Sequence, residues 1–163
     1  MDTKTIEETT TTWTKEPDRA RSAPAVTART EDGRVTMQAG AFTMHADLPA
    51  PLGGTNQAPS PTVLLLGALA GCAAAFVQDT LAPQLGVRVG SVEASARCET
   101  DARGLLGMDG VEPDLRAVAL DVTVDCPDGE DAVSGIARVW QERCPIYLAL
   151  QKPTDVAVRF RAA

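Results

Sequence analysis

Four cysteines are the residues with the widest chemical reach in this chain: Cys72, Cys98, Cys126 and Cys144. A thiol reacts as its thiolate, and two thiols that meet can cycle between dithiol and disulfide. Their spacing matches no CxxC metal clip, so no metal site is predicted. Cys98 and Cys126 fit strand-end and turn positions, where ordinary free thiols are expected. Cys72 and Cys144 remain as the candidates for chemistry.

Cys72 lies in the middle of residues 61–78, PTVLLLGALAGCAAAFVQ, a run without charged side chains. Ser60 can cap a helix that begins at Pro61, and Pro83 with Gly86 can end it. Such a run predicts a helix that is apolar on every face and therefore enclosed by protein. The apolar residues 63–77 would span roughly 22 Å, whereas a membrane span needs about 20 residues. A core helix is favoured over a membrane span.

Cys144 precedes Pro145, which is typical of the first position of a short helix over residues 145–150. Its sulfur would then face free backbone N–H groups, which favour the thiolate. Burial of Cys72 has the opposite effect, so that thiol needs a nearby cation, and Arg29 and Arg34 precede the helix in sequence. If the later helix folds back onto the earlier one, the two thiols could form a redox pair. Alternatively, both are packing cysteines.

The rest of the chain reads as short strands and two more helices. Residues 1–23 are polar and are predicted to form a disordered tail, whereas residues 24–163 form one domain. Strands followed by a buried helix, strands, helices and a last strand indicate an α+β fold with one sheet of five or six strands. The predicted strands are residues 25–30, 35–38, 41–46, 87–96, 115–124 and 156–160, and the later helices are residues 128–142 and 145–150.

Residues 48–60 contain three prolines and the pair Gly53-Gly54, which predicts an irregular loop beside the buried helix and a candidate binding loop. The two glycines are expected to serve the turn rather than to bind an oxyanion. His45, the only histidine, is either a base near this loop or an ordinary surface residue. Three apolar residues could line a pocket or simply belong to the core: Met44, Leu48 and Phe76.

The formal net charge of −7 argues against nucleic acid or an anionic membrane as partner. The N-terminus lacks the apolar segment of a signal peptide, so a cytoplasmic protein is expected. A helix buried on all sides needs more cover than a single sheet and one further helix provide. A second copy of the chain is the natural supplement, and the small residues Gly67 and Gly71 would allow another helix to approach closely.

The segment GGTNQAPSPTVLLLGALAGCAAAF, followed later by RCPIYLAL, resembles the signature of the OsmC/Ohr family of organic hydroperoxide resistance proteins. The correspondence runs from about residue 26 to residue 160. The resemblance implies an OsmC-like α+β fold in which an antiparallel sheet wraps around a buried central helix. It further implies an intertwined homodimer with active sites at the subunit interface.

The same resemblance implies a thiol-dependent peroxidase. Cys72 matches the peroxidatic cysteine, Cys144 the resolving cysteine, and Arg29 is the preferred match for the arginine that stabilises the thiolate, with Arg34 as the alternative. The thiolate would reduce an organic hydroperoxide to an alcohol and become a sulfenic acid, which Cys144 condenses to a disulfide. No bound cofactor is implied, only an external dithiol reductant of the dihydrolipoyl type.

The chain departs from the family pattern just after the proline that begins the helix. Many active members carry there a glutamate that orients the arginine, whereas this chain has Thr62 and Val63. Either another acid such as Asp47 takes over, or the chain lacks efficient peroxidase activity. The second case corresponds to an OsmC-like protein that binds a small apolar or thiol ligand at the dimer interface.

Overall fold

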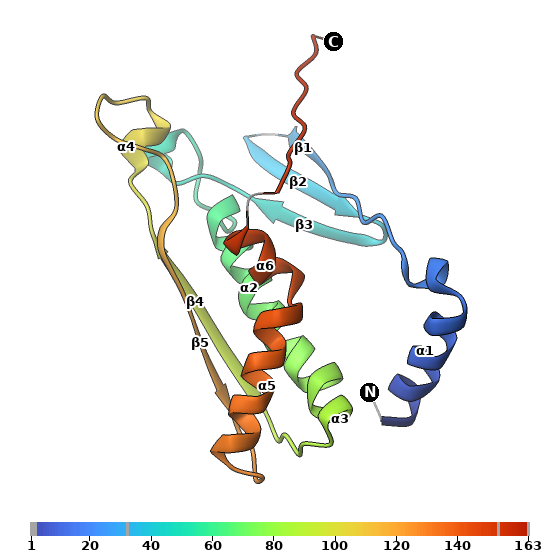
Figure 1. Ribbon diagram of the computed structural model, residues 1–163. Coiled ribbons are helices and arrows are strands. Elements are labelled where there is room, and N and C mark those ends of the chain that lie inside the picture. The colour runs from blue at the N-terminus through green and yellow to red at the C-terminus, as the bar shows by residue number, and fades with distance from the viewer. Residues whose placement is uncertain (1–2, 32, 153, 163) are drawn as a thin grey trace.

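The computed structural model describes residues 3–31, 33–152 and 154–162, and the α+β class predicted from the sequence is confirmed. The elements follow one another as α1 (Thr3–Lys15), η1 (Pro17–Ala20), β1 (Thr27–Glu31), β2 (Arg34–Ala39), β3 (Phe42–Ala46), η2 (Ala50–Leu52), α2 (Pro61–Phe76), the π-helical turn η3 (Val77–Leu81), α3 (Ala82–Leu85), β4 (Val92–Glu99), α4 (Ala102–Leu105), β5 (Arg116–Val124), α5 (Glu130–Arg143) and α6 (Pro145–Gln151). Helix α2 runs through the middle of the molecule (Figure 1).

The ends of the central helix lie where the local signals predict them. The Ser60 hydroxyl accepts a hydrogen bond from the Val63 N–H at 3.4 Å, and Pro61 occupies the first turn. The helical stretch ends at Gly86, whose φ of 67° lies in the left-handed region that terminates helices. Because α2 passes directly into η3 and α3, the stretch is longer than its apolar run.

This continuation changes the membrane argument. Residues Pro61–Leu85 form a 25-residue helical stretch whose most apolar window has a mean hydropathy of 1.7, so by length and composition it could cross a bilayer. The length of roughly 22 Å estimated from residues 63–77 alone therefore underestimates the helical stretch. Within the chain only 17% of that window is buried. The cover that it does have comes from strands and helices of the same chain.

One side of the central helix forms the hydrophobic core. Leu69, Ala73 and Val77 are buried there, against Ile136 and Trp140 of α5. Figure 1 shows the β4–β5 hairpin on one flank of α2, with α5 and α6 beside it. The helix is thus held between a two-stranded sheet and a second layer of helices.

The other side of α2 is left exposed by the described part of the chain. Val63 is 53% exposed and Leu65 is 37% exposed. Gly67 and Gly71, further along the helix, are exposed as well. The prediction of a helix buried on every face is therefore wrong for the single chain, because its sheet and helices reach only one side. A broad apolar helix face remains open.

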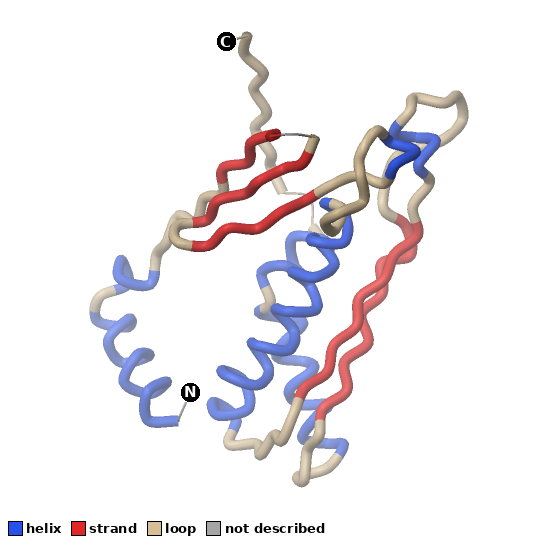
Figure 2. The backbone as a smooth tube through the Cα atoms, turned by 180° about the vertical axis from the view of Figure 1, so that it is seen from behind, coloured by secondary structure: helices blue, strands red, loops and turns tan. Residues whose placement is uncertain are grey.

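The strands form two separate antiparallel sheets rather than one sheet of five or six strands. One has the order β1-β2-β3 and the other pairs β4 with β5. Figure 2 shows the three-stranded sheet across one end of the helices, whereas the two-stranded sheet runs along their side. The last predicted strand, residues 156–160, is extended but has no strand partner among the described residues. Its Val156, Val158 and Phe160 are 76%, 67% and 97% exposed, so the rest of the described chain does not cover their side chains.

The register of β1–β3 separates polar from apolar side chains, because directly paired residues share a face. Arg29 pairs with Thr36, which pairs with His45. The neighbouring row, Ala28, Met37 and Met44, therefore lies on the opposite face. Met44 is 40% exposed on that apolar face. This sheet therefore also has an apolar surface that the chain leaves open.

The N-terminal segment differs from the predicted disordered tail, because residues Thr3–Lys15 form α1. The helix is amphipathic, buries Ile6 and contacts α3, where the Thr3 hydroxyl donates to the Pro83 carbonyl at 3.4 Å. Threonine hydroxyls along the helix donate hydrogen bonds to the carbonyls four residues earlier. Composition alone misses this helix, because a single buried isoleucine anchors it. The domain boundary at residue 24 stays a prediction.

Candidate active site

The structure brings the two candidate cysteines together from elements far apart in sequence. The sulfur atoms of Cys72 and Cys144 lie 3.0 Å apart, although 72 positions separate the residues. Cys72 belongs to the middle of α2, and Cys144 is the residue between α5 and α6. The Cys144 N–H donates to the Trp140 carbonyl at 2.8 Å and thereby ends α5. The corner between α5 and α6 thus holds one thiol against the other.

The first turn of α6 points backbone N–H groups at both sulfurs. As predicted, Cys144 caps α6: its sulfur accepts from the Tyr147 N–H at 3.5 Å. The Ile146 N–H is directed at Cys72 and lowers the pKa of that thiol. Such donors favour a thiolate over a neutral thiol. The same turn therefore serves both cysteines.

The pKa of Cys72 is nevertheless raised to about 11. Burial is the largest cause, and the adjacent Cys144 thiol adds to it, outweighing the Ile146 N–H. At neutral pH a thiol with this pKa is ionised in roughly one molecule in ten thousand. No cation among the described residues contributes to this shift. The isolated chain therefore holds two adjacent thiols, but Cys72 is not activated as a nucleophile.

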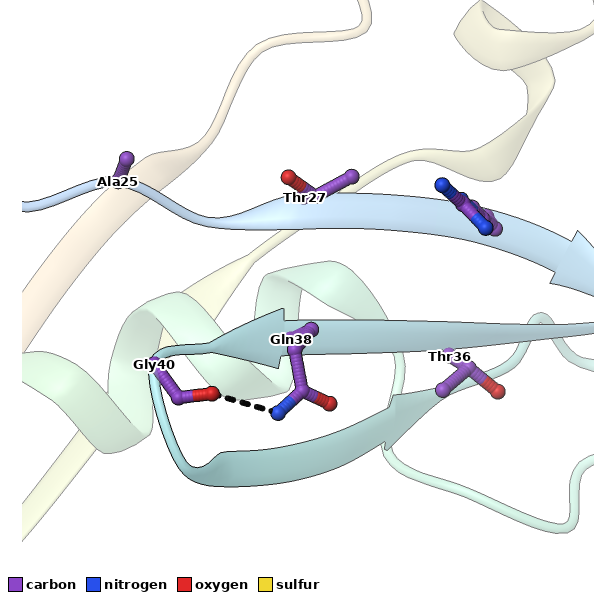
Figure 3. Close-up of a pocket in the computed structure, with 6 residues that line it drawn as sticks. Ala25, Thr27, Thr36, Gln38 and Gly40 are labelled. Carbon is purple, nitrogen blue, oxygen red and sulfur yellow. Dashed lines mark hydrogen bonds between the residues drawn. The ribbon is translucent and has the colours of Figure 1, made fainter.

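Arg29, the predicted thiolate stabiliser, lies on the exposed polar face of the β1–β3 sheet. It lines an open pocket of about 520 Å³ together with Thr27, Thr36 and Gln38. Figure 3 shows this pocket, in which the Gln38 amide donates to the Gly40 carbonyl at 2.7 Å. No hydrogen bond or ion pair among the described residues joins Arg29 to either cysteine. The alternation of β2 puts Arg34 on the same face.

Asp47 does not take the place of the missing glutamate within the chain. Its buried carboxylate accepts hydrogen bonds from the Thr55 hydroxyl at 2.6 Å and from the Gln57 N–H at 2.9 Å. The N–H groups of Thr55 and Leu48 also donate to it. These bonds, led by that of the Thr55 hydroxyl, hold the pKa of Asp47 far below its usual range. Asp47 organises the loop before α2, and no arginine among the described residues bonds to it.

The Gly53-Gly54 pair serves this loop, as expected. Gly53 has a φ of 88°, and a Cβ on Gly54 would stand 1.9 Å from the Leu48 carbonyl oxygen. The loop therefore folds tightly onto the Asp47 segment. A pocket of about 180 Å³ lies beside it. Leu48 lines this pocket, whereas Phe76 packs against the core and Met44 lies on the open sheet face.

The remaining candidates stay apart from the thiol pair. His45 lies on the exposed sheet face, with its Nδ1 3.5 Å from the Thr36 hydroxyl. Cys98 and Cys126 are partly buried free thiols. Among the described residues, no three His, Cys, Asp or Glu side chains gather as a metal site would require. Sequence reasoning assigned no site role to Trp140 or Ile146, because the groups that bond to the pair, the Trp140 carbonyl and the Ile146 N–H, belong to the backbone and leave no signal in the residue type.

Comparison with known proteins assigns the chain to a family. The family model described as OsmC-like protein matches residues 54–159, so the chain belongs to the OsmC-like family. This range contains α2 and α6 with both cysteines of the pair. No curated protein sequence matches the chain.

Solved structures share the fold at low sequence identity. An OsmC-like protein from Mycoplasma pneumoniae matches with a TM-score of 0.67 and 21% identity, over 81% of this chain and 89% of that one. An organic hydroperoxide resistance protein OsmC from Legionella pneumophila matches with a TM-score of 0.62 and 18% identity, over 80% and 90%. A putative organic hydroperoxide resistance protein from Vibrio cholerae matches with a TM-score of 0.61 and 20% identity, over 81% and 86%.

Proposed function

We propose that this OsmC-like protein is a thiol-dependent peroxidase that reduces organic hydroperoxides through Cys72 and Cys144. The observation that carries the proposal is the 3.0 Å separation of the two sulfurs. A disulfide needs about 2.05 Å between them, so only a small movement of the first turn of α6 is required when the hydroperoxide oxidises the pair. Fold neighbours named as hydroperoxide resistance proteins support the substrate class.

The proposed reaction begins at Cys72. Its thiolate attacks the terminal oxygen of the hydroperoxide, the O–O bond breaks, and the departing alkoxide takes a proton to become an alcohol. Cys72 is then a sulfenic acid. The Cys144 thiolate attacks that sulfur, hydroxide leaves and is protonated to water, and a disulfide remains. A dithiol reductant, which itself becomes a disulfide, returns both cysteines to thiols.

Cys72 is the proposed nucleophile and Cys144 the resolving thiol, because Cys72 is partly exposed whereas Cys144 has no exposed surface. A hydroperoxide can therefore approach the sulfur of Cys72 but not that of Cys144. Since the pKa of Cys72 is raised within the single chain, the proposal requires a cation from outside it. Arg29 of a second copy is the proposed source.

A homodimer is part of the proposal. The open face of α2, with Val63 and Leu65, and the apolar row of the β1–β3 sheet, with Met44, are two exposed apolar surfaces on one chain. Association of two copies would cover both apolar surfaces. In the proposed dimer, the edge or the polar face of the β1–β3 sheet, which carries Arg29, lies against α2 of the second copy. A cytoplasmic location and the absence of nucleic acid or membrane partners remain predictions.

The direct test is consumption of cumene hydroperoxide by the purified protein with dihydrolipoamide as reductant. The wild type should turn over repeatedly, whereas Cys72→Ser should fall to the rate of the buffer. Cys98→Ser, a free thiol outside the pair, is the matched control and should keep the wild-type rate. Equal rates in wild type and Cys72→Ser would refute the peroxidase.

A second function is favoured by Thr62 and Val63 together with the raised pKa of Cys72. In that case the protein binds a small apolar or thiol ligand at the dimer interface without efficient turnover. The Vibrio cholerae neighbour carries captopril in one of its active sites, which supports ligand binding at this kind of site. Saturable binding of a thiol ligand without hydroperoxide consumption would select this alternative.

A further inference from the structure

An aromatic pair spans the corner between α5 and α6. The rings of Trp140 and Tyr147 have centroids 5.2 Å apart, with their planes inclined at 45°. Aromatic rings whose centroids lie about 4.5–7 Å apart attract one another beyond the effect of the area that they bury. Trp140 lies in the last turn of α5 and Tyr147 in the first turn of α6. The ring contact therefore joins the two helices across Cys144, the residue at the corner.

The backbone groups of the same two residues hold Cys144. The Trp140 carbonyl accepts from the Cys144 N–H at 2.8 Å, and the Tyr147 N–H donates to the Cys144 sulfur at 3.5 Å. Trp140 and Tyr147 thus contact Cys144 through their main chains and each other through their side chains. Because Cys144 alone separates the two helices, a rotation of α6 about the corner would separate the rings and move the sulfur.

Helix α6 is weakly anchored by itself. It contains seven residues, too few for a stable helix in isolation, and none of them is fully buried. Trp140, by contrast, is 7% exposed and belongs to the hydrophobic core, against which Tyr147 packs. The indole Nε1 has no hydrogen-bond acceptor among the described residues, so Trp140 contributes its ring rather than a polar contact. The contact of Tyr147 with Trp140 therefore fastens α6 to the buried core.

We propose that the Trp140–Tyr147 pair positions the resolving thiol, and that it thereby favours disulfide formation over further oxidation of Cys72. This role rests on the proposed peroxidase function, since it concerns the sulfenic acid that the first hydroperoxide leaves on Cys72. Neither aromatic ring is part of the reaction itself. Both act through the place that they give to Cys144.

The sulfenic acid on Cys72 can react in two ways. The Cys144 thiolate can attack its sulfur, which forms the disulfide, and the departing hydroxide is protonated to water. Alternatively, the sulfenic sulfur attacks the terminal oxygen of a second hydroperoxide and breaks the O–O bond. The departing alkoxide then takes the proton that the sulfur group loses, and an alcohol and a sulfinic acid result. A Cys144 sulfur held 3.0 Å away favours the first reaction.

Tyr147→Leu tests this role, because it removes the ring and keeps the backbone N–H that donates to Cys144. Tyr147→Phe keeps the ring and is the matched variant. The first measurement is the equilibrium between the dithiol and the Cys72–Cys144 disulfide in buffers of reduced and oxidised dithiothreitol, without hydroperoxide. Loss of one aromatic contact should lower the equilibrium constant for disulfide formation by about 2- to 12-fold in Tyr147→Leu. Tyr147→Phe should equal the wild type.

The second measurement is mass spectrometry of Cys72 after treatment with excess cumene hydroperoxide. The ratio of sulfinic acid to disulfide should rise by a similar factor in Tyr147→Leu and stay at the wild-type value in Tyr147→Phe. Val124→Ala is the control for a general loss of stability. Val124 packs against the same core and ends β5, whose end lies away from α6 (Figure 1). This variant should unfold more readily and leave both readouts unchanged.

Wild-type values in Tyr147→Leu would overturn the proposal, and so would an equal change in Tyr147→Phe or in Val124→Ala. If circular dichroism shows that Tyr147→Leu is not folded, Tyr147→Met replaces it under the same criteria. A wild-type protein that forms the disulfide in dithiothreitol buffers but consumes no hydroperoxide would refute the peroxidase. In that case the equilibrium constants still decide whether the ring pair positions Cys144.

Discussion

Cys72 and Cys144 face one another at 3.0 Å because α5 and α6 meet at a sharp corner beside α2. The corner consists of Cys144 itself, whose extended backbone, with a ψ of 114°, separates the two helices. Pro145 then begins α6 and directs its first turn at α2. The thiol pair is thus a product of the helix corner. It is not a chance contact in a loop.

The roles of the two thiols can be separated by removing Cys144. In Cys144→Ser the sulfenic acid formed on Cys72 has no resolving thiol, so one equivalent of hydroperoxide should be consumed per chain, followed by a rate at least 100-fold lower. Dimedone labelling and mass spectrometry should find the adduct on Cys72. Continued turnover with dihydrolipoamide would mean that the reductant attacks the sulfenic acid directly, contrary to the role of Cys144.

Arg29 can be tested against Arg34, which lies on the same sheet face. An opposite charge within about 4–6 Å lowers a thiol pKa by roughly one to three units, so Arg29→Gln should slow Cys72 alkylation at pH 7 by about 10- to 1,000-fold. The rate of iodoacetamide labelling between pH 6 and pH 10 measures this, because only the thiolate reacts.

The outcome with Arg34→Gln decides the assignment. It should label like the wild type if Arg29 is the stabiliser. A slower rate in Arg34→Gln alone would transfer the role to Arg34. Unchanged rates in both variants would mean that neither arginine reaches the thiol.

The homodimer can be tested at Gly71 on the open face of α2. A Cβ added at this position meets nothing within 4 Å, so leucine fits the single chain. Overpacking a contact typically costs about 1–3 kcal/mol, so Gly71→Leu should weaken dimerisation by roughly 5- to 150-fold. Sedimentation velocity over a concentration series measures the change.

Gly135 provides the matched control, since a Cβ there also meets nothing within 4 Å and the residue lies in α5. Gly135→Leu should dimerise like the wild type. A dimer unaffected by Gly71→Leu would place the interface away from α2.

Asp47 makes stability depend on pH. Because its folded-state pKa is lowered, its carboxylate stabilises the protein above the unfolded pKa of about 3.9, and this stabilisation is lost as the pH falls toward the folded-state pKa. Asp47→Asn should therefore be less stable than the wild type by a constant amount above about pH 5. The difference should narrow below about pH 4.

Urea denaturation between pH 3 and pH 7 measures this difference. Asp109→Asn, in an exposed turn, is the control and should follow the wild type throughout. If the Asp47→Asn difference stayed the same at pH 3, the carboxylate charge would not be the source of the stability.

The sequence predicts α2, α5 and α6 because their signals are local. Ser60, Pro61 and Gly86 act within a few residues, and so does Pro145. Sheet assembly depends on contacts between residues far apart in sequence, and here the predicted single sheet differs from the two sheets of the structure. Residues 156–160 alternate like a strand, yet they find no partner in the chain. The tail was misjudged for a similar reason, since Ile6 gains its burial from α3, far along the sequence.

The candidate site divides in the same way. The resemblance to the OsmC/Ohr family identifies Cys72 and Cys144 as a pair from sequence, whereas their spacing alone left packing cysteines as the alternative. The electrostatics are not local. The raised pKa of Cys72 depends on burial and on Cys144, and the loop hydrogen bonds of Asp47 depend on how residues 48–60 fold. Thr62 and Val63 indicate that an acid is missing but not what replaces it.

The most direct measurement is the fate of the four thiols after one equivalent of cumene hydroperoxide in the absence of reductant. The account predicts that two of the four remain free, and that peptide mapping finds Cys72 joined to Cys144 in a disulfide, with Cys98 and Cys126 still reduced. Four free thiols, or oxidation confined to Cys98 or Cys126, would contradict it.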